Sequence, residues 1–312
     1  MTILVVAGAY ASSLNAAEIR QVAASKGCIQ TISSGSSLLS GIHTGQLPAS
    51  LFIKRCHGLW SGIRTKSGVL TSTPVQARFI PKFKARNKPH AIPDSRVAIS
   101  NKAVREAWLT RPTRRYDHAV LGDDIEAGGL KVSTSKGRRP ELILEPDSVF
   151  EDRVARLVDL DGDGRLEIVV VHSYLDSGAA LAIYGVRNEK IVRIAETAPI
   201  GRSHRWLNPA AAADFDGDGN MEIAWVETPH IGGILKIARL EGQGERKQLN
   251  VIAELEGFSN HQKGSRELQQ AVTFDWDGDG RSDLILPGSD RKTLRVVSFE
   301  GGKLQVIEEM PI

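Results

Sequence analysis

The sequence predicts an all-β protein built from repeated units. Two observations indicate this: an acidic motif that recurs, and the apolar run of residues that follows each copy. The motif DxDGDG occurs three times, beginning at Asp159, Asp214 and Asp275. Successive motifs begin 55 and 61 residues apart (from 159 to 214 and from 214 to 275), which is enough chain for a unit of several strands. An apolar run such as "EIVVV" or "DLILP" follows each motif. Runs of this kind, bounded by Asp and Gly, are typical of β-strands.

Each motif places carboxylates at alternate positions of a tight loop. Counted from the first Asp, acids stand at positions 1, 3, 5 and 9, and Gly stands at position 6. Like charges this close raise one another's pKa unless a cation lies among them. Hard oxygen ligands at this spacing suit Ca²⁺, with the glycine allowing the sharp turn and the backbone carbonyl of position 7 adding a ligand. The predicted calcium ligands are Asp159, Asp161, Asp163, Arg165 and Glu167; Asp214, Asp216, Asp218, Asn220 and Glu222; and Asp275, Asp277, Asp279, Arg281 and Asp283.

The three loops resemble the FG-GAP/VCBS repeats of integrin-α-type β-propellers, and the resemblance extends over about residues 93–312. It implies a β-propeller of four-stranded antiparallel blades, in which a DxDGDG loop opens a blade and binds calcium. Propellers typically have four to eight blades, so three acidic loops are fewer than the fold requires. We therefore expect about four blades, or five if upstream sequence contributes one, and about three structural calcium ions.

A fourth unit without acidic ligands is expected before the first motif. The segment "DHAVLGDDIEAGGLKVS", which begins at Asp117, fits the strand pattern that follows the other loops. Aligning Asp117 with position 9 puts Leu109, Arg111 and Thr113 where the aspartates stand elsewhere. This unit should therefore keep the strands and bind no metal.

The last unit should need a strand from elsewhere in the chain. It stops after its third predicted strand, at Ile312. Because an open arc of blades would expose sheet edges, we expect a closed propeller. The missing strand would then come from residues 95–100 or 103–109.

Charge is distributed unevenly along the chain. Residues 1–93 contain eleven Lys and Arg but one acid, Glu18, whereas the other residues carry 29 Lys and Arg against 36 Asp and Glu. A basic excess can indicate binding to nucleic acid or to a membrane surface. This part of the chain has neither nucleic-acid motifs nor interleaved aromatic residues, so we expect no nucleic-acid partner. No apolar run reaches the roughly 20 residues of a membrane span, so we expect no span.

The same shift in composition marks a domain boundary near Pro93. Residues 93–312 form the repeat domain, and residues 18–92 form a basic, acid-poor segment of poorly defined structure. That segment is either less ordered than the rest or the product of a misassigned start codon or reading frame.

Residues 1–17 form a candidate signal peptide. An apolar run from Ile3 ends in the small-residue pattern "AYA" at 9–11, but no basic residue precedes it, and a buried first strand is the alternative. Export to the periplasm or the medium is favoured, because weak calcium loops are useful where calcium is millimolar. In such a compartment Cys28 and Cys56 could form one disulfide, with two free thiols as the alternative.

No pattern marks a catalytic centre, since GxSxG, HExxH, CxxC and a phosphate-binding glycine loop are all missing from the sequence. A polar cluster between the motifs is the better candidate for ligand binding. Trp can stack on a sugar or peptide while His, Asn and Arg form hydrogen bonds to it; capping of the blades is the alternative role. The members of the cluster are Arg202, His204, Trp206, Asn208, His230, Asn260, His261 and Arg266.

Together these features predict an exported, monomeric, calcium-binding β-propeller. It would act as an interaction module for a protein, a peptide or a glycan, with calcium in a structural role. The alternative is a periplasmic hydrolase or lyase that uses the His, Arg and Glu residues of the polar cluster.

Overall fold

The described part of the chain is all-β, as predicted. The computed structural model describes residues 29–34, 50–55, 60–66, 69–75, 88–243, 246–268 and 270–311. These residues form strands and loops, and no helix is found among them. In that part of the chain, accordingly, no helix is long and apolar enough to cross a membrane. The candidate signal peptide, Cys28 and Cys56 lie outside the described residues.

The strands follow one another in five runs of four, and within each run consecutive strands pair in antiparallel fashion. We call each run a meander. The first is β1 (Ile29–Ser34), β2 (Ser50–Arg55), β3 (Trp60–Lys66) and β4 (Val69–Val75); the second is β5 (Ala98–Ile99), β6 (Val104–Thr113), β7 (Glu126–Thr134) and β8 (Glu141–Ile143); the third is β10 (Arg156–Val158), β11 (Glu167–Tyr174), β12 (Gly178–Arg187) and β13 (Lys190–Glu196); the fourth is β14 (Leu207–Ala213), β15 (Glu222–Glu227), β16 (Ile234–Gln243) and β17 (Arg246–Glu256); the fifth is β18 (Val272–Phe274), β19 (Asp283–Pro287), β20 (Thr293–Glu300) and β21 (Lys303–Pro311).

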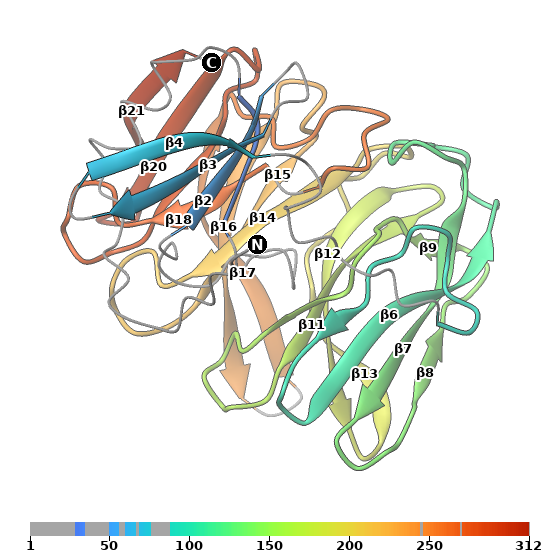
Figure 1. The fold of residues 1–312 in the computed structure, drawn as a ribbon. Helices are drawn as coiled ribbons and strands as arrows, with labels where there is room; N and C mark the ends of the chain where they lie inside the picture. Colours follow the sequence, from blue (N-terminus) through green and yellow to red (C-terminus); the bar gives the residue numbers. More distant parts are fainter. Residues whose placement is uncertain are drawn as a thin grey trace, which may run out of the picture.

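A short strand, β9 (Ser148–Phe150), joins the second and third meanders into one nine-stranded sheet. It pairs with β11, where Phe150 lies opposite His172, and it touches β7, where Phe150 lies opposite Ala127. The first meander lies at the other end of the molecule, with β1 against β18 of the fifth (Figure 1). The first and last parts of the described chain therefore meet in space.

The core lies between consecutive meanders, as β11 shows. Ile168 and Val170 belong to a cluster shared with the second meander, whereas Val169 and Val171 belong to one shared with the fourth. Successive side chains of a strand point to opposite faces, so β11 is covered on both sides. A strand buried on both faces reads as a continuous apolar run, which explains "EIVVV".

The same division occurs in β15. Ile223 and Trp225 face the third meander, while Ala224 and Val226 face the fifth. From the second meander to the fifth, the sheets are thus packed face to face in sequence order.

The second meander departs from the sequence prediction. Leu109, Arg111 and Thr113 lie inside β6, a continuous strand of ten residues, and not in a loop. The equivalent of the acidic loop is the short connection 100–103 between β5 and β6. The alignment on Asp117 was wrong because the next strand, β7, begins only at Glu126.

The fifth meander is complete without a borrowed strand, which also corrects the prediction. The strand before each acidic loop pairs with the strand after it, as β18 pairs with β19, so it belongs to the same sheet. Residues 95–100 and 103–109 instead contain β5 and part of β6, which pair with each other where Ala98 lies opposite Ala107.

Gly233 stands where the chain turns into β16, directly against the backbone of Phe258. Its φ is +44°, and a Cβ on it would lie 1.5 Å from the carbonyl oxygen of Phe258. Its own carbonyl accepts the N–H groups of Gly257 and Phe258 at 2.9 and 3.1 Å. A side chain here would push apart two backbones that hydrogen bonds hold together.

We expect Gly233→Ala to lower the free energy of unfolding by about 3 kcal/mol or more, because clash and backbone strain add. Gly232→Ala is the matched control: its φ is +83°, but nothing lies within 4 Å of the added carbon. Strain alone should cost this variant about 1–2 kcal/mol. Urea unfolding followed by circular dichroism measures both, and equal losses would contradict the packing described here.

Candidate functional site

Three acidic loops connect the first and second strands of the third, fourth and fifth meanders. We call them loop A (159–167), loop B (214–222) and loop C (275–283). The glycines at positions 4 and 6 of each loop have φ between +69° and +89°, a conformation that glycine adopts without steric cost.

The three loops share one pattern of backbone hydrogen bonds. The N–H of position 6 donates to the carboxylate of position 1 at 3.0, 2.9 and 3.1 Å in loops A, B and C. The N–H of position 5 donates to position 3 at 3.1, 3.3 and 3.2 Å. The N–H of position 7 donates to position 5 at 2.7, 2.8 and 2.8 Å. The loops are therefore one structural unit used three times.

Position 9 of each loop is a buried carboxylate at the start of the second strand. Glu167 and Glu222 are fully buried, and Asp283 is 3% exposed. Each accepts the N–H of position 2, at 2.9, 2.8 and 2.8 Å in loops A, B and C. Burial, with the neighbouring loop carboxylates, raises the pKa of Glu167 and of Asp283 to about 7, and burial also raises the pKa of Glu222. A cation beside these groups would have the opposite effect.

The structure brings three of the four predicted acids of each loop together. Their oxygens lie within 4.8 Å of one another in the sets Asp159, Asp161 and Glu167; Asp214, Asp216 and Asp218; and Asp275, Asp277 and Asp279. The remaining acids, Asp163, Glu222 and Asp283, lie outside these sets. The position-7 residues Arg165, Asn220 and Arg281 contact the acids through their amide N–H groups. A ligand role for their carbonyls stays a prediction.

The carboxylate oxygens of loop A are arranged in a way that suits a bound cation. Asp159 Oδ1 and Glu167 Oε1 are buried and have no hydrogen-bond partner. The guanidinium of Arg187 lies 4.0 Å from Glu167 Oε1, which is too far for a hydrogen bond. Buried carboxylate oxygens without partners are costly, and a set of hard oxygens is what Ca²⁺ prefers. The donor set of loop A fits calcium.

Basic side chains approach the three loops to different extents. Lys247 contacts Asp161 of loop A, and Arg281 contacts Asp279 within loop C. Arg239 of β16 contacts three acids of loop B. The loops are alike in backbone but unlike in the charge that surrounds them.

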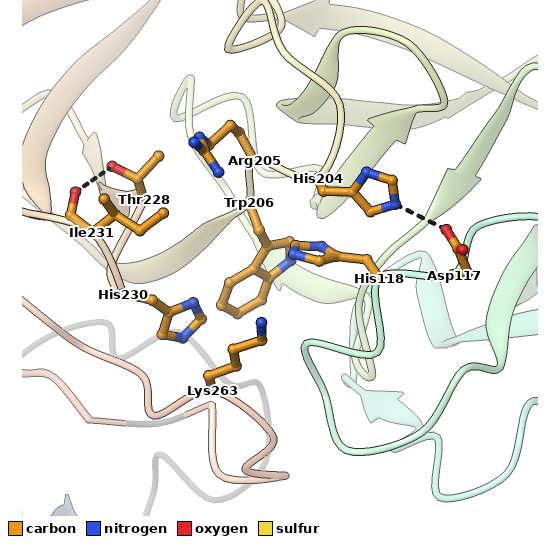
Figure 2. A pocket seen from close by; sticks show the side chains of 9 residues that line it. All are labelled: Asp117, His118, His204, Arg205, Trp206, Thr228, His230, Ile231 and Lys263. Atoms are coloured by element: carbon orange, nitrogen blue, oxygen red, sulfur yellow. Dashed lines mark hydrogen bonds and ion pairs between the residues drawn. The ribbon is translucent and has the colours of Figure 1, made fainter.

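A separate pocket of about 550 Å³ lies where loops of the second, third and fourth meanders meet (Figure 2). It contains three imidazoles, one indole, two cations and one carboxylate. The lining residues are Asp117, His118, His204, Arg205, Trp206, Thr228, His230, Ile231 and Lys263.

His118 is held in the pocket by a buried acid. Its Nδ1 lies 2.6 Å from Oε1 of Glu151, which is fully buried and also accepts a hydrogen bond from Ser173 Oγ at 2.6 Å. Burial raises the pKa of Glu151 to about 8. Burial, together with Lys263 and Arg205, lowers the pKa of His118 to about 4. The imidazole is therefore neutral at pH 7, with its other nitrogen left for a ligand.

A pair of imidazoles, His230 and His261, lies across the pocket from His118. His230 Nε2 is 2.9 Å from His261 Nδ1, and His261 Nε2 is 2.9 Å from the carbonyl oxygen of Ser265. The carbonyl fixes the proton on His261 Nε2, so His261 Nδ1 accepts from His230. Trp206 stacks on His230 with an interplanar angle of 3°. Burial lowers the pKa of both histidines to about 4.

The two cations of the pocket, Arg205 and Lys263, are not part of the ion pairs found in the described part of the chain. Among the residues that the structure describes, no carboxylate pairs with Arg205 or Lys263. The one acid of the lining, Asp117, is bound by Nε2 of His204 at 2.9 Å, on the far side from Lys263 in Figure 2. A pocket that holds the neutral imidazoles of His118 and His230, together with two cations that no described carboxylate pairs with, is suited to a ligand that carries a negative charge.

The polar cluster predicted from the sequence is only partly one site. His204, Trp206 and His230 line the pocket, and His261 supports His230 from behind. Arg202 and Arg266 do not line it. Arg266 instead pairs with carboxylates of the second meander region, Asp94 and Asp123.

The two asparagines of the cluster are structural. Asn208 and Asn260 are fully buried, and each amide donates to the other's backbone carbonyl, at 3.1 and 2.9 Å. Asn208 also donates to the carbonyl of Leu268 at 2.8 Å. These bonds tie β14 to the connection between the fourth and fifth meanders, beneath the pocket.

The family model of the FG-GAP-like repeat matches residues 159–225, which include loops A and B. The chain therefore contains an FG-GAP-like repeat. The match runs from loop A through β11, β12, β13 and β14 into β15, so it includes three of the four strands of the third meander and the beginning of the fourth. No curated protein matches this FG-GAP-type chain in sequence.

Solved structures resemble the FG-GAP-type chain only distantly. Hsv2 from Kluyvelomyces marxianus is 9% identical, with a TM-score of 0.35 over 84% of this chain and 68% of that one. The WD40 domain of Toxoplasma gondii coronin is 13% identical, with a TM-score of 0.30 over 92% of this chain and 59% of that one. Scores this low carry no conclusion about what the FG-GAP-type chain binds.

Proposed function

We propose that this protein is an exported interaction module whose fold is a five-bladed propeller stabilised by calcium. Two observations support the blade count: from the second to the fifth, consecutive meanders share a core, and the first meander lies beside the last (Figure 1). In this arrangement each meander is a blade, and the basic N-terminal segment supplies the first one.

The common backbone of the three loops carries the calcium part of the proposal. Carboxylates at positions 1, 3, 5 and 9 would hold the ion, as the orphaned oxygens of Asp159 and Glu167 indicate for loop A. The ion would neutralise the cluster, and the loop would then fix the start of the second strand against the first. Exposed loops of this kind bind calcium at about 10⁻⁴–10⁻³ M, which suits an extracellular protein and supports export.

The pocket supports the interaction part of the proposal. Its volume is in the range of small-ligand sites, and its charge favours a partner with an acidic group. Arg205 and Lys263 would bind the negative charge, while His118 and His230 form directed hydrogen bonds. The ligand class is therefore an acidic glycan or an acidic peptide.

Reversing the charge of Lys263 tests this assignment. On an array of matched acidic and neutral glycans and peptides, the wild-type protein should retain acidic members. Lys263→Glu should weaken that retention about tenfold or more, because an attraction becomes a repulsion at close range. Lys303→Glu, an exposed site in the hairpin between β20 and β21, makes the same change in net charge and should have little effect. Equal retention by both variants, or retention of neutral members only, would contradict the assignment.

The pair His118–Glu151 favours a second candidate, a hydrolase or lyase. A neutral imidazole oriented by a buried carboxyl group has the geometry of a general base. Incubating the retained array members with the protein separates the two functions. Cleavage that is lost in Glu151→Gln would support the enzyme, and retention without cleavage supports the module.

A further inference from the structure

We infer that Arg239 takes the place of calcium in loop B, so that the middle repeat needs no metal ion. The inference rests on the proposed calcium role of the loops. It starts from the strand register, which puts Arg239 of β16 directly opposite Glu222, the position-9 acid at the start of β15. No such residue stands opposite the other two position-9 acids. Continuing the registers Ile168↔Tyr184 and Leu284↔Val297 by one residue places Gly185 and Ser298 there.

The guanidinium contacts three of the four acids of loop B. Its Nε donates to Glu222 Oε1 at 2.7 Å, and its Nη2 contacts Asp216 and lies 3.0 Å from Asp218 Oδ2. The fourth acid, Asp214, accepts the N–H groups of Gly217 and Gly219. A planar, permanently charged fork is well suited to bridge several carboxylates. No carboxylate oxygen of loop B is both buried and without a hydrogen bond.

Loop A is not satisfied in this way. Lys247 contacts one oxygen of one carboxylate, Asp161 Oδ2. Asp159 Oδ1 and Glu167 Oε1 stay buried without a hydrogen bond. Lys247 therefore pairs with one carboxylate of loop A and leaves the buried oxygens of Asp159 and Glu167 for a cation.

In loop C no basic side chain of the described residues bridges several of the acids. Arg281 belongs to the loop itself and reaches outward, to Asp279 and to the exposed Glu300 of β20. Within the described residues, no basic side chain pairs with the buried Asp283, which accepts the Trp276 N–H. The three loops share one backbone, but among the described residues only in loop B does a single guanidinium bridge the buried position-9 acid and two aspartates.

Calcium would have to displace Arg239 to enter loop B. The displaced guanidinium would lose three carboxylate partners at a place that is only one-quarter exposed. Removing one partner of such a cluster is costly, because the other charge is left unpaired. In loop A an entering ion would displace one ammonium contact, that of Lys247 with Asp161, and in loop C no basic group of the described residues pairs with the buried Asp283. The penalty is therefore largest in loop B, and the protein should bind two calcium ions.

Calcium counting on the full chain tests the inference. Calcium-stripped protein is titrated with CaCl₂ and the bound ions are counted by equilibrium dialysis and calorimetry. The wild type should bind two ions. Arg239→Ser, which installs the residue found opposite in loop C, should bind three. Arg295→Ser is the control, since Arg295 lies on β20 and pairs with Glu309 away from the loops, and it should bind two.

Two further variants keep the test decisive if Arg239→Ser does not fold. Asp275→Ala should lower the count from two to one, whereas Asp214→Ala should leave it at two. Three ions in the wild type, or the loss of one ion in Asp214→Ala, would overturn the inference while leaving the calcium role of the loops in place. A wild type that binds no calcium would overturn the calcium role itself, and the inference with it.

Discussion

Removing calcium should lower the midpoint of thermal unfolding by on the order of 10 °C. A site at a hundredfold excess of calcium over its Kd adds about 2.7 kcal/mol to the free energy of unfolding, so two filled loops add about 5 kcal/mol. That is comparable with the whole stability of an ordinary domain. Differential scanning calorimetry of calcium-loaded protein, with and without excess chelator, measures the difference.

Two controls accompany this measurement. Magnesium should restore little of the lost stability, because it demands a tighter octahedral shell than a loop built for calcium provides. Asp159→Ala should lose part of the calcium response, since it removes a position-1 ligand of loop A. An unchanged melt in excess chelator, on protein shown to start calcium-loaded, would contradict the structural role of the ion.

The calcium-free protein should also depend on pH in a defined direction. In the absence of calcium the pKa of Glu167 and of Asp283 is about 7, above the value of about 4 for such groups in an unfolded chain. The folded state then holds these protons more tightly, so their contribution to stability is complete below about pH 4 and is lost as the pH rises through 7. Bound calcium should remove this dependence between about pH 4 and pH 7, because the ion favours the ionised form of both carboxylates in the folded protein.

The second large effect is expected at a buried ion pair between β9 and β10. Asp152 and Arg156 are both fully buried, and Arg156 Nη1 lies 2.5 Å from Asp152 Oδ2. Asp152 also accepts the N–H groups of Arg153, Val154 and Val171, at 2.8, 3.3 and 3.1 Å. One carboxylate therefore holds the turn before β10 and the middle of β11.

Asp152→Ala should lower the free energy of unfolding by about 3–5 kcal/mol, because a guanidinium is left buried without a counter-ion. Nε and Nη2 of Arg156 have no hydrogen-bond partner, so the bond from Nη1 to the Val154 carbonyl, at 3.2 Å, is the one that would remain to this buried cation among the described residues. Asp176→Ala, at an exposed turn, is the control and should change stability by less than about 0.5 kcal/mol. Urea unfolding in excess calcium measures both, and a loss at Asp152 no larger than at Asp176 would show that the pair is not formed.

The acidic loops and the strands around them could be predicted from the sequence because both are local. Position 1 to position 9 spans nine residues, and the apolar run after Glu167 is long enough to identify β11. The second meander could not be aligned, because its connection at 100–103 carries no acid and β6 starts before the point where the pattern placed a loop. Without an acidic motif, apolar spacing alone did not fix the register of that unit.

The pocket was predictable only in the part that is close in sequence. His204, Trp206 and His230 come from neighbouring segments of one repeat region, and the sequence placed them together. His118 comes from the second meander and Lys263 from the connection between the fourth and fifth, so they join the pocket only through the packing of sheets. Arg239 was missed for the same reason, since its contact with Glu222 is set by the register of β15 and β16.

A crystal grown in calcium, with the ions located from their anomalous scattering, tests the account most directly. We expect a calcium ion among the carboxylates of loop A and another in loop C. We also expect loop B to hold no ion, with the guanidinium of Arg239 lying against Glu222. Crystals in millimolar calcium that show no ion in loop A or loop C would contradict the proposal that calcium stabilises this fold.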